Sequence, residues 1–497
     1  MKRHYILLVI AACGLTGCNL APTYQKPVAP TQTHYKESGR WLPATPSVAA
    51  LQRGPWWRLY HDPVLNKLED RVTLANQDIK AAVARFDEAR AELAVARSAL
   101  YPTVLGIANA FRAQDSGNVA NKVTTPLFND ELLSVNFNYE VDLWGRVRNT
   151  VAAAGSLAAA SKADLAAVQL RLHADLATYY FTLRGADNAQ AVLDETVRAD
   201  QKALTLVKHR YQGGADPISN LDDAQRQLET ARTLATDNRL QRAQLEHAIA
   251  VLIGEAPANF TLPKRRSRIK VVHVSPQLPS TLLEQRPDVA EAEFKVQAAN
   301  AQIGVARAAF FPAFNLSGGF GVESQSLVNL LRSPSIVWSL GPTTAAALLN
   351  DGAMPLLTQT IFDGGKIRAL SDRARARYEE TAANYRQTVL QAFQEVEDSL
   401  VALHRLQQED RTQQAAAHAA ERALHQALYR YQGGLTTYLN VVVEENAALE
   451  SELAAVNVRT RQLVASVQLI KALGGGWQGD TPKSDPSPRP HSALCQR

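Results

Sequence analysis

Residues 366–432 read KIRALSDRARARYEETAANYRQTVLQAFQEVEDSLVALHRLQQEDRTQQAAAHAAERALHQALYRYQ, and Gly433-Gly434 follows directly. The stretch contains neither glycine nor proline, which predicts one unbroken helix. At 1.5 Å per residue, that helix would be about 100 Å long. Phe393, Val396 and Leu400 begin a coiled-coil seam, and the glycine pair predicts the helix end because glycine readily adopts the left-handed conformation. A helix of this length exceeds an ordinary globular core and predicts a spanning or tubular structure.

The same unit occurs twice in the chain. Arg-Tyr-Gln-Gly-Gly at 210–214 recurs at 430–434, and Gly-Arg-Val-Arg at 145–148 recurs as Gly-Lys-Ile-Arg at 365–368, both displaced by 220 residues. A third match is Ala-Arg with a following proline, which occurs at 96–102 and again at 306–312. Three matches in the same order predict a tandem duplication. Each copy is expected to hold a helix of about 35 residues ending at Tyr101-Pro102 or Phe311-Pro312, a short β-region, the long helix, and a return helix at 217–253 or 436–473.

The β-regions have the pattern of membrane strands. Along 133–142, apolar residues such as Val135 and Phe137 alternate with polar residues, and 103–112 is the expected partner strand. Ten alternating residues match a tilted transmembrane strand, although a half-buried strand of a soluble sheet has the same period. The second copy holds a similar strand from Phe314, and a fourth strand at either 336–346 or 355–363. Four strands cannot close a barrel in lipid, so the pattern predicts an oligomer whose chains pool strands.

The N-terminus carries an export signal. Two basic residues precede a short apolar segment and then Leu15-Thr16-Gly17-Cys18, which resembles the lipobox of bacterial lipoproteins. An ordinary secretory signal with a chance cysteine is the alternative. The resemblance implies that the Cys18 thiol is lipidated and that the chain is cut just before it, which removes residues 1–17. Asn19 at the next position favours the outer membrane by resemblance to lipoprotein sorting rules. Cys495 would be the other cysteine of the mature chain.

Composition excludes several classes of protein. The net charge of +5 over 497 residues is too mild to indicate nucleic-acid binding, and three cysteines exclude a disulfide framework. The sequence holds no H-E-x-x-H, G-x-S-x-G or G-x-x-x-x-G-K-[ST] motif, and its histidines are scattered, with His173, His209 and His404 lying singly in helical stretches. We therefore expect no enzyme activity, no cofactor and no metal site.

Together these features resemble the outer-membrane efflux (TolC) family, in its lipoprotein branch. The resemblance rests on an ordered set of motifs: Trp56-Trp57 with Asp62-Pro63, Asp142-Leu143-Trp144-Gly145-Arg146, Leu278-Pro279-Ser280 with Arg286-Pro287-Asp288, Phe362-Asp363-Gly364-Gly365, both Arg-Tyr-Gln-Gly-Gly bends, and Leu473-Gly474-Gly475-Gly476-Trp477. It implies a mainly α-helical homotrimer with coiled-coil hairpins, in which four strands per chain build a 12-stranded outer-membrane β-barrel continuous with a helical tunnel through the periplasm. A periplasmic adaptor and an inner-membrane pump are the implied partners, and the channel would conduct drugs or other small toxic compounds passively.

The resemblance also places the two bends at a periplasmic tip, where the adaptor docks and the tunnel narrows. By this resemblance, the candidate residues for contact with the adaptor are Arg210, Tyr211, Gly213, Gly214, Arg430, Tyr431, Gly433 and Gly434. The alternative is that these residues simply cap helices. It also implies gate residues, namely Leu439, Asp222, Asp223 and Glu444. Here the chain departs from the family, because Val443 and Asn446 stand where an aspartate and an arginine are expected and the acids Glu444 and Glu445 are shifted.

The expected organisation follows from these segments. Its predicted parts are a lipoprotein signal peptide (1–17), a lipidated extended segment (18–59), a first repeat (60–253), a basic linker (254–275), a second repeat (276–474) and a tail (475–497). A periplasmic coiled-coil adaptor or structural lipoprotein is the alternative function. It would show one hairpin with soluble β-domains instead of two duplicated hairpins. The sequence does not indicate which compound is exported.

Overall fold

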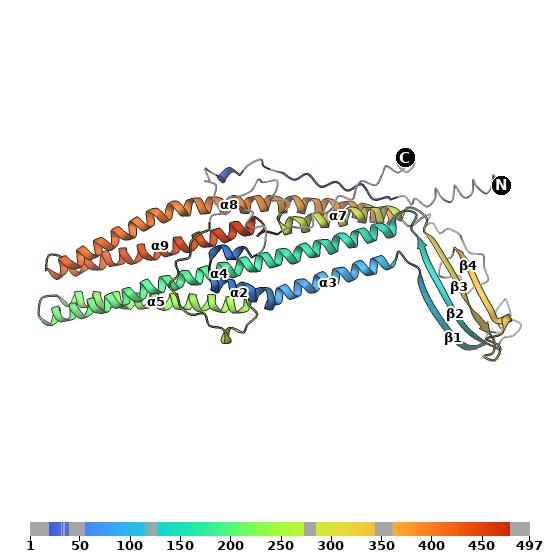
Figure 1. The fold of residues 1–497 in the computed structure, drawn as a ribbon, viewed down its shortest axis with the longest axis horizontal. Coiled ribbons are helices and arrows are strands. Elements are labelled where there is room, and N and C mark those ends of the chain that lie inside the picture. The colour runs from blue at the N-terminus through green and yellow to red at the C-terminus, as the bar shows by residue number, and fades with distance from the viewer. Residues whose placement is uncertain are drawn as a thin grey trace.

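The structure is a computed structural model of the chain, and it describes residues 19–30, 32, 35–38, 55–114, 116, 118, 127–272, 285–342, 360 and 362–477. The predicted signal peptide, Cys18 and the tail from 478 lie outside the described residues. A four-stranded sheet stands at one end of an elongated molecule, and two long helical hairpins extend to the other (Figure 1).

The hairpins confirm the prediction of long helices. Helix α4 spans Arg146–Gln212 and helix α8 spans Lys366–Gln432, each of 67 residues. The return helices are α5 (Ile218–Leu252) and α9 (Tyr438–Ala472), within two residues of the predicted bounds. The two hairpins lie side by side with both bends at the same end of the molecule (Figure 1).

The prediction of one continuous helix before the first β-region is wrong. The helical segment is divided into α2 (Pro63–Ala75) and α3 (Gln77–Ser98). Asn76 separates them because its side-chain oxygen accepts hydrogen bonds from the backbone N–H groups of Asp78 and Ile79, at 2.8 and 3.1 Å, and so caps α3. Its amide also donates to the carbonyl of Leu252 at 2.8 Å.

The remaining helices are short. In the second repeat, α7 spans Pro287–Ala308, and residues 273–284 before it lie outside the described part of the chain. Turns of 3₁₀-helix are η1 (Lys36–Ser38), η3 (Trp56–Tyr60), η4 (Pro257–Asn259) and η5 (Ser333–Ser335).

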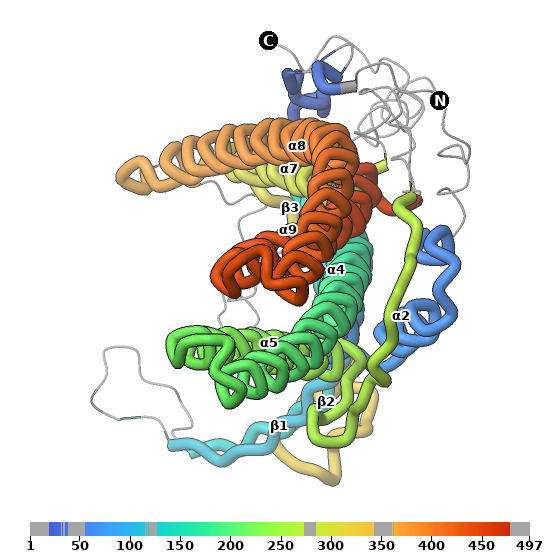
Figure 2. The backbone as a smooth tube through the Cα atoms, turned by 90° about the vertical axis from the view of Figure 1, so that its left-hand side faces the viewer, coloured from blue at the N-terminus to red at the C-terminus, as the bar shows by residue number. Residues whose placement is uncertain are grey.

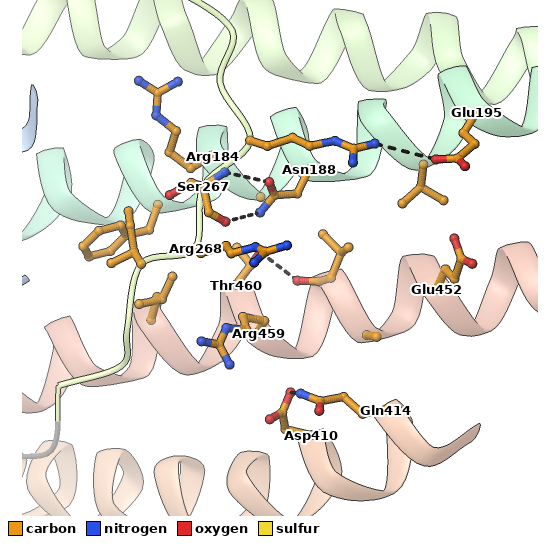
Figure 3. A pocket seen from close by; sticks show the side chains of 18 residues that line it. Arg184, Asn188, Glu195, Ser267, Arg268, Asp410, Gln414, Glu452, Arg459 and Thr460 are labelled. Atoms are coloured by element: carbon orange, nitrogen blue, oxygen red, sulfur yellow. Dashed lines mark hydrogen bonds and ion pairs between the residues drawn. The ribbon is translucent and has the colours of Figure 1, made fainter. Parts of the chain in front are cut away.

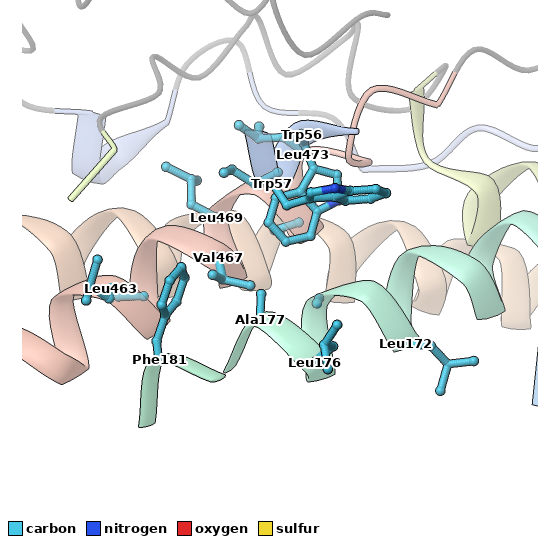
Figure 4. Close-up of a cluster of buried hydrophobic side chains, with 14 of the residues drawn as sticks. Trp56, Trp57, Leu172, Leu176, Ala177, Phe181, Leu463, Val467, Leu469 and Leu473 are labelled. Atoms are coloured by element: carbon cyan, nitrogen blue, oxygen red, sulfur yellow. The ribbon is translucent and has the colours of Figure 1, made fainter. Parts of the chain in front are cut away.

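An aromatic core joins the two repeats midway along the helices. Helix η3 places Trp56 and Trp57 in a buried cluster with apolar side chains of α4 and α9 (Figure 4), and Tyr60 of η3 packs on Phe181 of α4 with ring centroids 4.7 Å apart. The two indole rings meet edge to face with centroids 5.7 Å apart, and Trp57 stacks on His173 at 4.5 Å. Rings at this separation add to the gain from apolar burial, so the tryptophan pair fastens the N-terminal segment to both repeats.

Residues 19–30 of the N-terminal segment are extended, as their prolines predict, and run along the second repeat (Figure 1). Asn300 of α7 donates to the carbonyl of Pro22 at 2.8 Å, and Lys26 pairs with Glu293 at 2.7 Å. Further along, the carboxylate of Glu397 on α8 accepts two backbone N–H bonds from η1. These contacts hold the segment along α7 and α8.

The sheet is antiparallel in the order β1-β2-β3-β4. Its strands are β1 (Thr103–Gln114), β2 (Leu127–Val141), β3 (Phe314–Ser324) and β4 (Ile336–Pro342). The fourth strand therefore lies in the first of its two predicted ranges, and most of the second range lies outside the described residues. Within the described chain, β1 and β4 each pair along one side, so the sheet has two open edges.

The strand register separates an apolar face from a polar face. Val135 of β2 stands opposite Gly106 and Phe320, and Phe320 stands opposite Trp338 of β4. The adjacent row, on the other face, contains Leu105, Asn136, Gly319 and Ser339. Val135, Phe320 and Trp338 are 54%, 63% and 74% exposed in the single chain. A bare apolar face opposite a polar one is the pattern of strands between lipid and water.

Candidate gate at the hairpin tips

We call the two bends, residues 213–217 and 433–437, the tip. In the first bend the N–H of Ala215 donates to the carbonyl of Arg210 at 2.8 Å, and the second bend repeats this bond. The closing glycines, Gly214 and Gly434, have φ of 74° and 73°. This left-handed geometry satisfies carbonyl groups that the helix leaves unpaired, so the capping role expected of these two glycines is present.

The first glycine of each pair differs from the second. Gly213 and Gly433 have φ of −81° and −79°, which other residues also adopt. A Cβ atom at Gly213 would meet nothing nearer than the carbonyl oxygen of His209, at 3.4 Å. The expectation that both glycines take the left-handed conformation is therefore wrong for the first of each pair.

A polar link crosses between the hairpins at the tip. Asp216 accepts a hydrogen bond from Nε of Arg210 at 3.0 Å and another from the hydroxyl of Tyr431 in the other repeat. The guanidinium of Arg210 also lies over the Tyr431 ring, 4.8 Å from its centroid. Burial raises the pKa of Tyr431, so its hydroxyl stays a donor at neutral pH. We call Arg210, Asp216 and Tyr431 the tip link.

The tip link changes the role expected of Tyr431. Tyr431 is 2% exposed and packs against Tyr438 with ring centroids 5.3 Å apart, so it contacts its own chain and is not free for an adaptor. Asp216 is not among the tip residues predicted from the sequence. A comparison of the two repeats could have identified Asp216, because the first repeat has an acid at this position and the second repeat has Thr436 at the matching position.

The other predicted adaptor contacts lie at the surface of the tip. Tyr211 and Arg430 are exposed, and so are the four glycines of the bends. Arg210 is half-buried because it turns towards Asp216. Adaptor contact by Tyr211, Arg430 and the four glycines stays a prediction.

An exposed apolar row runs along the start of α9. Leu439 and Val443 on α9 are 59% and 56% exposed, and Leu435, in the bend before α9, is 80% exposed. Residues four apart lie on one face of a helix. Val443, which replaces the aspartate expected by resemblance, therefore extends the apolar row begun by the predicted gate residue Leu439.

The predicted acidic gate residues lie on two different helices. Asp222 is exposed on α5, and Asp223 beside it pairs with Arg226 at 3.3 Å. Glu444 is half-buried on α9, next to Val443. Glu445 is 7% exposed and cannot line a passage in this conformation.

The basic linker forms one wall of a cavity of about 580 Å³ between α4, α8 and α9 (Figure 3). Ser267 exchanges two backbone hydrogen bonds with the side chain of Asn188, at 2.9 and 3.0 Å. Arg266 pairs with Glu195 at 3.7 Å, and acidic and basic side chains both line the cavity. The linker is thus held to the first repeat.

Comparison with known proteins decides the family. The family model described as outer membrane efflux protein matches residues 69–255 and 278–475. The chain belongs to this family. The two matches overlap the two predicted repeats, 60–253 and 276–474, and the resemblance drawn from the sequence motifs is confirmed.

Individual relatives agree across nearly the whole chain. It is 30% identical to outer membrane protein OprJ of Pseudomonas aeruginosa, over 94% of this chain and 95% of OprJ. It is 29% identical to the cation efflux system protein CusC of Escherichia coli, over 96% of this chain and all of CusC. The crystal structure of the Campylobacter jejuni CmeC outer membrane channel superposes with a TM-score of 0.85 at 26% identity, over 93% of this chain and 96% of that one.

These likenesses establish the fold and the general role. The long hairpins and the small sheet are the helical tunnel part and the barrel part of an outer-membrane efflux channel. The protein therefore serves efflux at the outer membrane and extends into the periplasm. Its relatives are channel proteins and not enzymes.

Proposed function

We propose that three copies of the chain close one channel through the outer membrane, which passively conducts compounds delivered by a periplasmic adaptor and an inner-membrane pump. The sheet is the observation that carries this proposal. Each chain has four strands, one apolar face, and unpaired edges at β1 and β4 among the described residues. An open edge is not tolerated in lipid, because its backbone groups would lack hydrogen-bond partners.

Pairing of β1 in one copy with β4 in the next removes both edges. The contact is head-to-tail, so repeated rotation closes a ring. Three copies of four strands give twelve, and the polar rows that include Asn136 and Ser339 then line the interior. The apolar rows that include Val135 and Trp338 then face lipid.

The tip supports the proposal of a closed resting state. The tip link ties one hairpin to the other, and the exposed apolar row at Leu439 and Val443 presents three copies of the same surface in a trimer. Apolar side chains that meet around an axis exclude water and ions. Opening then requires that the hairpins move apart.

The exported compound is left open. Relatives of similar identity are named for different cargoes: CusC for cation efflux, TtgC of Pseudomonas putida for toluene efflux, and OpmQ of Pseudomonas aeruginosa for pyoverdine export. One channel architecture thus occurs with unrelated substrates. Selection of the substrate by the pump, and not by the channel, accounts for this range.

The oligomer can be tested by cross-linking the open edges. Single cysteines along β1 at Leu105, Ile107 and Asn109 are combined with cysteines along β4 at Val337 and Ser339, all on the polar face, in a chain whose Cys495 is replaced by serine. We expect one register to give disulfide-linked dimers and trimers in isolated outer membranes, with nothing larger. A ladder that stops at the dimer, or that continues past the trimer, would contradict a three-copy barrel.

The lipid anchor at Cys18 belongs to the same proposal. Cys18 lies outside the described residues, but its neighbour Asn19 accepts a hydrogen bond from Asn149 at 2.9 Å, near the start of α4. This contact places Asn19 near the junction of β2 and α4, at the level where a lipid on the preceding residue would enter the membrane. We expect Cys18→Ala to abolish labelling with radioactive palmitate, with Cys495→Ala as the control that keeps it. Labelling that survives Cys18→Ala would exclude this anchor.

A further inference from the structure

Two apolar clusters hold the first hairpin against the second. The cluster nearer the tip includes Val207 of α4 and Val442 of α9, and the other includes Leu193 of α4 and Leu449 of α9. Asp200 lies between the clusters on α4, and Glu445 lies between them on α9. Two acids from different repeats therefore interrupt an apolar contact.

Both carboxyl groups are removed from water. Asp200 is 1% exposed and Glu445 is 7% exposed. Among the described residues, no group donates a hydrogen bond to either oxygen of Asp200 or to Oε2 of Glu445. The two carboxyls are within hydrogen-bonding reach of each other, and a bond between two carboxyl groups requires that one of them carry a proton.

Within the described part of the chain, the influences that shift the pKa values of Asp200 and Glu445 are burial and the other carboxyl, and no cation is among them. The pair lies near Tyr438 of α9, which in turn lies near Tyr431 of α8 and Asp223 of α5, and these groups are not cations either. From α5, Gln227 donates instead to Asn446, at 2.8 Å. Two adjacent buried carboxylates cannot both ionise without a large cost in free energy.

We propose that Asp200 and Glu445 bind one proton between them, and that this shared proton holds the two hairpins together above the tip. No such proton site follows from the family resemblance or from the tip link, which uses other residues. The proton site itself is independent of the proposed function. Its effect on a channel rests on that function.

The contact between the hairpins depends on pH, and the direction follows from the pKa values of the two carboxyls when the hairpins are packed together and when they are separated. Burial, and then the hydrogen bond with Asp200, raise the pKa of Glu445 to about 9, and burial also raises the pKa of Asp200. When the hairpins separate, both groups meet water and their pKa values return to about 4. Separation therefore releases a proton between about pH 4 and pH 9, so the contact is strongest in acid. It weakens by up to about tenfold per pH unit as the pH rises towards 9.

Infrared titration tests the proton directly in the purified full-length protein. We expect the carbonyl stretch of a protonated carboxyl group to disappear as the pH rises through about 9, and this signal to be missing in Glu445→Gln. The matched control is Glu450→Gln, which changes an exposed acid on the same helix and should keep the signal. Burial also raises the pKa of Glu69 well above its ordinary value, and the infrared contribution of Glu69 should be the same in both variants.

Conductance in planar bilayers tests whether the shared proton holds the two hairpins together. Wild type should open more readily as the pH rises from about 7 to about 10, whereas Glu445→Gln should lose this dependence because its amide donates to Asp200 at every pH. An unchanged infrared spectrum in Glu445→Gln would overturn the proton site. A pH profile that shifts with the concentration of sodium or calcium would assign the pair to a cation instead. If the infrared signal behaves as expected but no variant conducts ions, the channel proposal fails and the proton site stands.

Discussion

Val135→Arg is expected to remove the protein from the outer membrane. Val135 lies near the middle of β2, in the exposed apolar row with Phe320 and Trp338. An arginine on the lipid face at the bilayer midplane costs about 2–4 kcal/mol in a membrane barrel. A trimer would incur that cost three times, for a total on the order of 10 kcal/mol, which is comparable to the whole stability of a protein domain.

Asn136→Arg is the matched control. It introduces the same side chain one residue away, on the polar face opposite Gly319, where an arginine can remain in water. We expect this variant to stay in the sarkosyl-insoluble membrane fraction and to migrate as an oligomer without boiling, while Val135→Arg is degraded or extracted. Equal retention of the two variants would show that the faces are assigned wrongly.

Asp216→Ala is expected to open the tip. The substitution removes the acceptor of both Arg210 and Tyr431 and leaves a half-buried guanidinium without its partner. A hydrogen bond to a charged group contributes about 1.5–3 kcal/mol. Only the bond from Tyr431 crosses between the hairpins, and its loss in each chain corresponds to a change of about tenfold to a hundredfold in the ratio of open to closed channels. Tyr431→Phe removes one of the two bonds and should have a smaller effect.

Leakage of large antibiotics into cells measures this opening. Asp237→Ala is the control, because Asp237 is an exposed acid of α5 whose hydrogen bond stays within that helix, with Gln241. We expect cells with Asp216→Ala to become sensitive to antibiotics too large for ordinary porins, at unchanged protein abundance, and cells with Asp237→Ala to resist them. The tip link would have no gating role if both variants behaved as wild type.

Periodic features of this fold could be predicted from the sequence. The long helices follow from two 67-residue stretches bounded by glycines, one of them free of glycine and proline, and the strands follow from alternation around Val135 and Phe314. The duplication follows from two copies of the same bend. Each of these signals lies within one stretch of chain or in the comparison of two stretches, so no knowledge of tertiary contacts is needed.

Features that depend on single distant pairs could not be predicted. Asp216 and Tyr431 are 215 residues apart, and nothing local distinguishes Asp216 from the many surface acids until the hairpins pack. Asp200 and Glu445 likewise acquire their character from burial between two helices. The break at Asn76 depends on whether its side chain caps α3. Such a side-chain hydrogen bond to the backbone is an alternative to continuing the helix through Asn76.

Single-channel recording in planar lipid bilayers tests the central claim most directly, with purified wild type and Asp216→Ala compared at one pH and salt concentration. A channel closed at its tip predicts small, infrequent openings for wild type, and openings that are larger and at least about ten times more frequent for Asp216→Ala. Equal currents from the two proteins, or no current from either, would contradict a gated channel closed by the hairpin tips.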